Sequence, residues 1–147
     1  MPETDRIDKI IRSLRELNQA FFQATRKYAE ESGITHIQFF ALRLLKQYPM
    51  IGLSELAIHM RASPSTVSGV VERLVQANLI MRERPEQDRR SLVLRLSPQG
   101  EELLAGTEAR IMERLSPLLD IPDEDIEHML KVHQQMIQIL KKICEEK

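Results

Sequence analysis

Positive charge is concentrated in one block of the chain, residues 61–95. This block contains seven arginines, no lysine and four acidic residues, whereas residues 96–147 contain six basic and eleven acidic residues. The net charge of −1 for the whole chain hides this distribution. Arginine makes bidentate hydrogen bonds to phosphates and to guanine edges. The block therefore has the residue type that suits duplex nucleic acid, provided that the fold gathers the arginines on one face.

Small hydroxyl residues lie where a helix is predicted to begin within this block. Ser63 is a favourable N-cap and Pro64 a favourable first residue, so we expect a helix over residues 64–77. Its outward face begins with Ser65, Thr66, Ser68 and Gly69 and continues with Glu72, Arg73 and Gln76. Hydroxyl groups can donate to phosphates or bases, and a glycine permits close backbone approach. Because hydroxyl residues also favour the first turn of any helix, capping and base contact explain each of them equally well.

A charged hairpin is predicted to follow this helix. Residues 79–84 and 91–96 alternate between apolar and polar side chains as strands do, and the charged residues 85–90 connect them. Arg89 or Arg90 at the tip could enter a minor groove, and Asp88 could hold the Arg90 guanidinium by a charge-assisted hydrogen bond. The alternative is a solvated hairpin tip with Asp88 as a turn residue.

The elements around these candidates form a recognisable arrangement. A helix of about two turns over residues 53–60, a tight turn, the capped helix and the hairpin together predict a winged helix-turn-helix, whose second helix fits the major groove of DNA. Arg61 and Ser63 lie in the turn, and Arg61 is expected to clamp the DNA backbone. The fold class is mainly α with a small β-hairpin wing.

Longer amphipathic helices are predicted on both sides of this module. Residues 5–31 form one, and a second begins with a capping box of Thr35 and Gln38 and ends before Pro49. A third begins at Pro98 and extends to Leu119, and a fourth follows Pro122. The apolar stripe of the second helix is expected to be core: Ile37, Phe40, Ala41, Leu44 and Leu45.

The helices at the two chain ends carry apolar stripes that the central module does not need for its own core. The stripes are Ile7, Ile10, Ile11, Leu14, Leu17, Phe21 and Phe22 at one end and Ile126, Met129, Leu130, His133, Met136, Ile137, Leu140 and Ile143 at the other. Packed against a second copy, they would bury on the order of 2,000 Å² in a two-fold interface. A homodimer is therefore expected, with its recognition helices about 34 Å apart.

Several segments resemble one family. They are Thr35-His36-Ile37-Gln38-Phe39, Leu53-Ser54-Glu55-Leu56-Ala57, Ser65-Thr66-Val67-Ser68, Leu74-Val75 and the run Asp88-Arg89-Arg90-Ser91-Leu92-Val93-Leu94-Arg95-Leu96-Ser97-Pro98-Gln99-Gly100. In this order they resemble the MarR family of bacterial transcriptional regulators, over nearly the whole chain. The resemblance implies an obligate homodimer that binds a pseudo-palindromic operator in double-stranded DNA and usually represses transcription.

The resemblance also assigns residues and domains. The wing pair of the family falls on Asp88 and Arg90, and its recognition-helix contacts fall on Ser65, Thr66, Ser68 and Arg73. Residues 34–97 are the expected DNA-binding domain, and residues 1–33 together with 98–147 the helical dimerisation domain. Relatives often bind small aromatic carboxylates beside the winged domain. The candidates for lining such an effector site are Phe21, Phe22, Phe39 and Arg43, each equally well explained by packing or solvent exposure.

Other classes of protein fit less well. The single cysteine, Cys144, lies between apolar and acidic neighbours and outside the first helix, where thiol-sensing relatives carry theirs. The four histidines lack metal-site spacing, and no phosphate loop or nucleophile elbow is present, so we expect no metal, no cofactor and no enzyme. No long apolar run or signal peptide is evident, and the expected compartment is the cytoplasm. The alternative function is a winged-helix adaptor that binds proteins rather than DNA.

Overall fold

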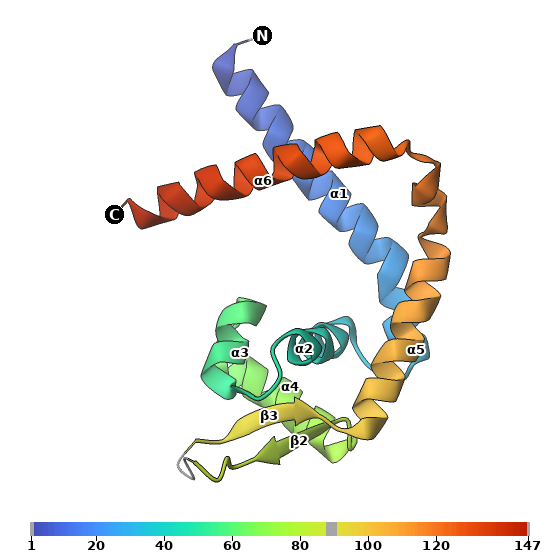
Figure 1. Cartoon of the computed structure of the whole chain (residues 1–147), viewed down its shortest axis with the longest axis vertical. Coiled ribbons are helices and arrows are strands. Elements are labelled where there is room, and N and C mark those ends of the chain that lie inside the picture. The colour runs from blue at the N-terminus through green and yellow to red at the C-terminus, as the bar shows by residue number, and fades with distance from the viewer. Residues whose placement is uncertain (1, 88–90, 147) are drawn as a thin grey trace. The chain divides into compact units, whose positions relative to one another are not determined.

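The structure is a computed structural model that describes residues 2–87 and 91–146. Its chain divides into two compact units, residues 1–111 and 112–147. The first unit contains α1 (Glu3–Glu31), α2 (His36–Gln47), β1 (Ile51–Gly52), α3 (Leu53–Met60), α4 (Pro64–Gln76), β2 (Ile80–Glu83) and β3 (Val93–Leu96), and most of α5 (Pro98–Arg114) (Figure 1). The second contains a 3₁₀ helix (Ser116–Asp120) and α6 (Asp123–Glu145). The fold is mainly helical with a small sheet, as predicted.

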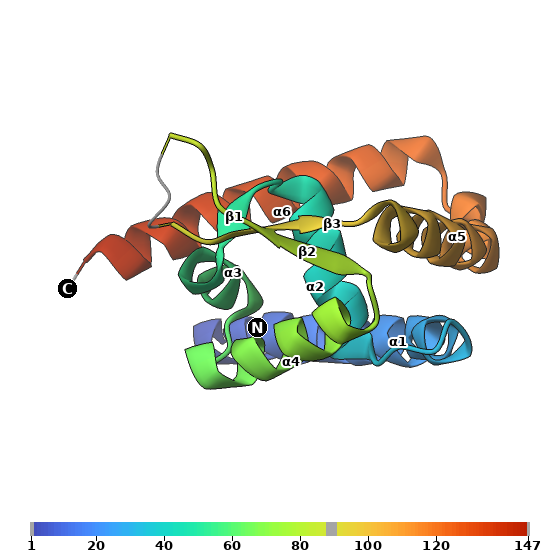
Figure 2. The ribbon, with the colours of Figure 1, turned by 90° about the horizontal axis from the view of Figure 1, so that it is seen from below.

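The sheet has three antiparallel strands in the order β1-β3-β2 (Figure 2). Ile80 pairs with Leu96 and Glu83 with Val93, which fixes the hairpin register. The third strand, β1, was not predicted from the sequence; its two residues pair with Val93 and Leu94. The winged helix-turn-helix is thus complete, with α3 and α4 as its two helices.

Local capping signals were predicted correctly. Thr35 accepts a hydrogen bond from the backbone N–H of Gln38, and the Gln38 side chain accepts one from the backbone N–H of Thr35. Ser63 caps α4, and Pro64 is the first residue of that helix. Asn78 adopts a left-handed conformation with φ of 62°, as expected for the residue that follows a helix end.

The core of the first unit lies between α2, α3, α4, the sheet and the start of α5. Its fully buried side chains include Leu42, Leu45, Leu56, Val67, Val71, Leu74, Ile80, Leu94 and Leu104. The prediction that Ile37 and Phe40 belong to the core is wrong. Their side chains are 40% and 38% exposed, whereas Phe39 is buried. The difference arises because α3, α4 and β3 cover another side of α2, whereas Ile37 and Phe40 line a pocket described below.

Two further expectations are corrected. The predicted alternation puts Leu79 and Met81, and also Leu92, on the apolar side of the strands. In the structure Leu92 is exposed, and Ile80 rather than Met81 is buried, because Leu79 precedes β2 in the turn that closes α4 and does not set the phase of that strand. The helix from Pro98 ends at Arg114 instead of reaching Leu119. Pro117 explains a break here, since proline lacks the N–H that a continued α-helix requires. The chain continues in the 3₁₀ helix, and Leu118 and Leu119 are exposed.

Candidate nucleic-acid interface

Helix α4 has one buried face and one exposed face. Val67, Val71 and Leu74 are buried in the core. The exposed residues that follow Pro64, which we call the outer face of α4, are Ser65, Thr66, Ser68, Gly69, Glu72, Arg73 and Gln76. They are small, polar or charged, and none is a large apolar residue. The predicted recognition-helix residues therefore lie together on solvent-exposed helix surface.

One of the hydroxyl groups at the start of α4, that of Ser63, caps the helix. Ser63 accepts a hydrogen bond from the backbone N–H of Thr66 at 3.2 Å and donates one to Thr66 Oγ1 at 2.9 Å. Its oxygen also lies 3.2 Å from Ser65 Oγ. Ser63 is thus a helix cap, whereas Ser65 and Ser68 are exposed residues without a capping role.

No residue among 2–87 and 91–146 packs against the position of a Gly69 side chain. A Cβ atom built on Gly69 would meet nothing within 4 Å. Glycine inside a helix costs about 1 kcal/mol relative to alanine, because it loses more conformational freedom on folding. No described residue packs against this position, so the backbone of α4 is uncovered there on its exposed face.

Arg61 lies between the two helices of the helix-turn-helix. It caps the C-terminus of α3 in a left-handed conformation, with φ of 54° and ψ of 42°. Its side chain and that of Arg73 are exposed, and neither has an ion-pair partner among residues 2–87 and 91–146. Both guanidinium groups are therefore available to an anionic partner.

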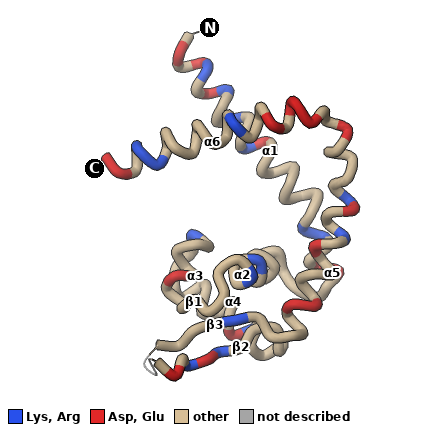
Figure 3. The backbone as a smooth tube through the Cα atoms, in the orientation of Figure 1, with Lys and Arg blue, Asp and Glu red and all other residues tan. Residues whose placement is uncertain are grey.

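The wing carries charges that the sequence patterns did not single out. Asp88, Arg89 and Arg90 lie outside the described residues, but the strands beside them are described. Arg82 on β2 pairs with Glu72 on α4, and Arg95 on β3 pairs with Glu83 on β2 at 2.8 Å. Basic and acidic residues follow one another along β2 (Figure 3). The Arg95–Glu83 pair follows from the strand register, which could have indicated it once the hairpin was predicted.

A pocket of about 700 Å³ lies within the first unit beside α1 and α2. The residues that line it are Arg15, Asn18, Gln19, Phe21, Phe22, Thr25, His36, Ile37, Phe39, Phe40, Arg43, Met60 and Ile111. All four candidate effector residues are among them. The lining thus combines aromatic rings with two guanidinium groups and, in the part of the chain that is described, no carboxylate.

His36 gives this pocket an unusual polar atom. Its ring meets that of Phe22 edge to face, with centroids 4.3 Å apart and planes at 74°. Its Nδ1 is buried and has no hydrogen-bond partner among the described residues. Burial lowers the pKa of His36 below its ordinary value, so the ring is neutral near pH 7.

The cysteine and the other histidines of the described chain are not among the residues that line this pocket. Cys144 is a free, exposed thiol. Across residues 2–87 and 91–146, no three His, Cys, Asp or Glu side chains lie close enough together to hold a metal ion. His59 stacks on Tyr48 with centroids 4.2 Å apart. In the same described ranges, no helix has the length and apolar character needed to cross a bilayer.

The sequence of this chain is similar to sequences of known proteins. A model of the MarR family matches residues 34–92, which include α2, α3, α4 and the first strand of the hairpin, β2. The HTH-type transcriptional repressor MdtR of Bacillus subtilis (strain 168) is 35% identical over 121 residues, which cover 77% of this chain and 78% of MdtR. The chain belongs to the MarR family. MarR family relatives are named as transcriptional repressors and regulators, a class of protein that is not catalytic in general.

Solved MarR family structures share the fold at lower identity. Staphylococcus aureus MarR in complex with salicylate and kanamycin has a TM-score of 0.81 and 20% identity, and 92% of each chain is covered. A point mutant of S. aureus MepR bound to an oligodeoxyribonucleotide has a TM-score of 0.62 and 22% identity, with 89% of this chain and 97% of MepR covered. These likenesses establish a common fold.

Proposed function

We propose that this MarR family protein is a transcriptional repressor that binds double-stranded DNA of a specific sequence as a homodimer. The observation that carries the proposal is the outer face of α4, which exposes small, polar and charged side chains and, at Gly69, a position where a Cβ atom would meet no described residue within 4 Å. A helix with small polar residues and a bare backbone position fits closely into a major groove. The oligodeoxyribonucleotide bound to MepR supports this use of the shared fold.

The proposed contacts are of two kinds. Phosphate contacts position a protein on DNA, and contacts to base edges specify the sequence. The residues that we assign to the interface are Arg61, Ser63, Ser65, Thr66, Ser68, Gly69, Arg73, Asp88, Arg89 and Arg90. Among them, Arg61 is assigned to the backbone, Arg73 to a phosphate or guanine edge, and Arg90 to the minor groove. Residues 34–97 form the DNA-binding domain in this proposal.

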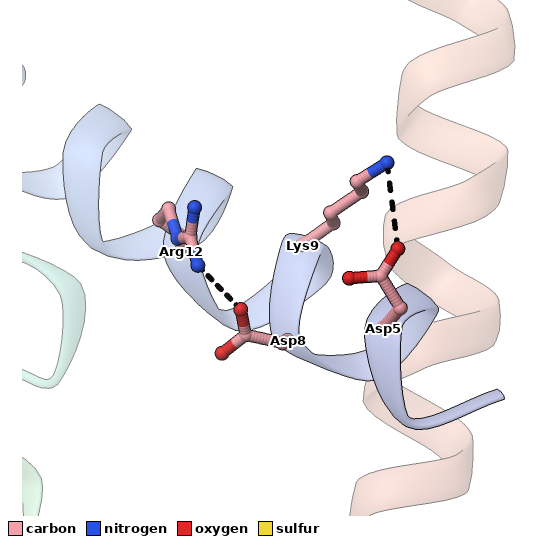
Figure 4. A network of polar contacts seen from close by, with 4 residues as sticks. All are labelled: Asp5, Asp8, Lys9 and Arg12. Carbon is pink, nitrogen blue, oxygen red and sulfur yellow. Dashed lines mark hydrogen bonds and ion pairs between the residues drawn. The ribbon is translucent and has the colours of Figure 1, made fainter. Parts of the chain in front are cut away.

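Dimerisation is assigned to residues 1–33 and 98–147, whose helices expose apolar stripes. The stripe of α1 includes Ile7, Ile10, Ile11, Leu14 and Leu17, all exposed in a single chain. Its polar side carries the i,i+4 ion pairs Asp5–Lys9 at 3.7 Å and Asp8–Arg12 at 2.5 Å (Figure 4). On α6, Leu130, Ile137, Leu140 and Ile143 are exposed as well. Apolar surface of this extent marks an interface, and a second copy that covers it would produce inverted half-sites in the operator.

The pocket beside α1 and α2 is the proposed site for a small aromatic effector. Phe21, Phe22 and Phe39 offer ring faces and edges, and Arg15 and Arg43 offer charge for a carboxylate. Salicylate bound to S. aureus MarR supports this ligand class. Binding would release DNA only if the ligand prefers a conformation whose recognition helices do not match the operator. We propose no catalytic activity and no cofactor, and a cytoplasmic location together with the DNA.

Selection of duplexes from a random pool by the purified protein tests the proposal. Selected fragments should share two inverted half-sites about one helical turn apart. Affinity for them should fall log-linearly with salt, and Arg73→Ala and Arg90→Ala should each weaken binding, with about 1–3 kcal/mol of lost discrimination if Arg73 reads a base. A protein-binding adaptor would show no enrichment and no salt-dependent DNA affinity, and unchanged affinity in both variants would reject the assignment.

A further inference from the structure

The outer face of α4 contains one acidic residue, Glu72. It follows Ser65 and Gly69 at helical spacing, so all three lie along one side of the helix. Its side chain is 52% exposed. A carboxylate on this side would repel DNA phosphates if no cation accompanied it. The proposed function therefore requires an explanation for Glu72.

Arg82 supplies the accompanying cation. It lies on β2 opposite Leu94, so its side chain leaves the sheet on the same face as the buried Leu94 and Ile80. This face is the one that packs on the helices, and the Arg82 guanidinium reaches Glu72 there. The ion pair thus bridges the wing and the outer face of α4.

The Glu72–Arg82 ion pair contributes little to the stability of the fold. Both side chains are more than one-third exposed, and exposed ion pairs contribute only about 0–1 kcal/mol. A guanidinium has five N–H donors in a fixed plane, so a carboxylate that engages one edge leaves donors for a second anion. The segment that joins α4 to the tip of the wing is β2, and the proposed function brings DNA against both α4 and the wing, where basic side chains meet the phosphates. The Arg82 guanidinium lies in that segment.

We infer that Arg82 is a further DNA-contact residue, which donates to a backbone phosphate, and that Glu72 is the positioning residue that holds it there. This inference rests on the proposed function. It assigns Glu72 an indirect role, in contrast to direct reading of a cytosine amino group by a glutamate. The two roles give opposite results in a double-variant experiment.

Arg95 offers a matched control. It also lies in the hairpin, and its pair with Glu83 has comparable exposure, but Arg95 is opposite Met81 and so projects from the other face of the sheet. Arg82→Gln and Arg95→Gln each remove one positive charge from the wing. A difference in DNA binding between the two variants is therefore due to the position of the lost charge and not to the change in net charge.

The salt dependence of binding tests the contact. Affinity for a fluorescein-labelled mixed-sequence duplex of about 30 base pairs is measured by anisotropy from roughly 50 to 200 mM KCl. We expect Arg82→Gln to reduce the slope of log affinity against log salt by about 0.9 per subunit, the value for one lost phosphate contact. Arg82→Lys should restore most of this slope, and Arg95→Gln should retain it. Equal slopes for Arg82→Gln and Arg95→Gln would overturn the inference.

The positioning role is tested with the duplex that the protein selects from a random pool. Glu72→Gln should lower affinity for this duplex in the wild-type background, because Arg82 loses its orientation. In the Arg82→Gln background it should raise affinity, because it removes an unpaired carboxylate from beside the phosphates. A decrease in both backgrounds would assign base reading to Glu72, and no change in either would remove its role; both results contradict positioning.

Failure of this inference can be distinguished from failure of the proposed function. A wild-type protein that binds neither duplex at low salt rejects the proposed function itself. Salt-dependent binding by the wild type, with Arg82→Gln indistinguishable from Arg95→Gln, rejects only the assignment of Arg82. Thermal unfolding of each variant verifies folding, and Arg82→Lys, which keeps the charge and the stem, tests the contact if Arg82→Gln does not fold.

Discussion

Gly100 lies so close to the backbone of Leu79 that a Cβ atom on Gly100 would overlap the Leu79 carbonyl oxygen. The contact joins the start of α5 to the turn after α4. Ser97 reinforces it, since its hydroxyl donates to the Asn78 carbonyl at 2.5 Å and accepts from the Gly100 N–H at 2.9 Å. The backbone N–H of Ser97 also donates to the Leu79 carbonyl at 3.0 Å. Two segments about 20 residues apart in the sequence are thereby fixed at backbone distance.

Gly100→Ala should destabilise the protein by about 2 kcal/mol or more, because the new methyl group meets backbone atoms that cannot rotate away. Urea unfolding measures the loss. Gly106→Ala on the same helix is the control, since a Cβ there meets nothing within 4 Å, and it should raise the free energy of unfolding by about 0.5–1 kcal/mol. Equal effects at the two positions would contradict the contact.

Gly69→Ala should change stability and DNA affinity in opposite directions. The helix gains about 0.5–1 kcal/mol from alanine, since the new methyl group enters open space. The same methyl group would obstruct the close approach of DNA to α4, so operator affinity should fall. Urea unfolding and anisotropy titration on one preparation measure both quantities. A stabilised variant with unchanged operator affinity would remove Gly69 from the interface.

Alanine substitutions at Ser63 and Ser65 should distinguish helix capping from contact with DNA. Ser63→Ala removes the hydroxyl that accepts from the Thr66 N–H and should cost about 1 kcal/mol of stability. Ser65→Ala removes an exposed hydroxyl without a capping role and should change stability by less than about 0.5 kcal/mol. Its effect should appear instead as reduced operator affinity. Loss of stability in Ser65→Ala similar to that in Ser63→Ala would be inconsistent with this division.

The apolar stripe of α1 should be necessary for assembly. Leu17→Glu places a charge in the proposed two-fold interface and should shift the dimer toward monomer in sedimentation velocity, because burying an unpaired carboxylate is costly. Lys9→Glu, on the ion-paired side of the same helix, is the control and should remain dimeric. A dimeric Leu17→Glu protein would exclude this part of α1 from the interface.

Stability should depend on pH through His36. Burial lowers the pKa of His36 in the folded chain, so below about pH 6.5 the unfolded chain binds a proton that the folded chain does not. The free energy of unfolding should therefore be unaffected by His36 above that pH and should decrease as pH falls below it. Urea unfolding between about pH 5 and 7.5 should show a smaller decrease for His36→Gln than for the wild type. Parallel curves would rule out this contribution.

The parts of the fold that the sequence predicts well depend on local chemistry. The capping box of Thr35 and Gln38 and the Ser63 cap with Pro64 each depend on residues within one turn of chain. The interface candidates on α4 follow from the same signals, because a capped helix with one apolar face must expose the other.

The parts that the sequence does not predict depend on contacts between distant segments. The two residues of β1 have no period of their own and become a strand only by pairing with β3. Ile37 and Phe40 fit an apolar stripe, but their exposure depends on which side of α2 is covered by α3, α4 and β3. The pairing of Glu72 with Arg82 likewise requires the register of the hairpin against α4, which no local pattern contains.

Helix α2 is shared by two regions of the first unit. Phe40 and Arg43 on one side line the pocket, while Leu42 and Leu45 on the other are fully buried in the core, where α2 packs on α3 and α4. A close-packed interior resists compression, so a helix moved on one side displaces whatever it touches on the other. A small molecule wedged beside α2 would thus transmit force to α4 through side chains that already touch, with no need for a flexible linker between them.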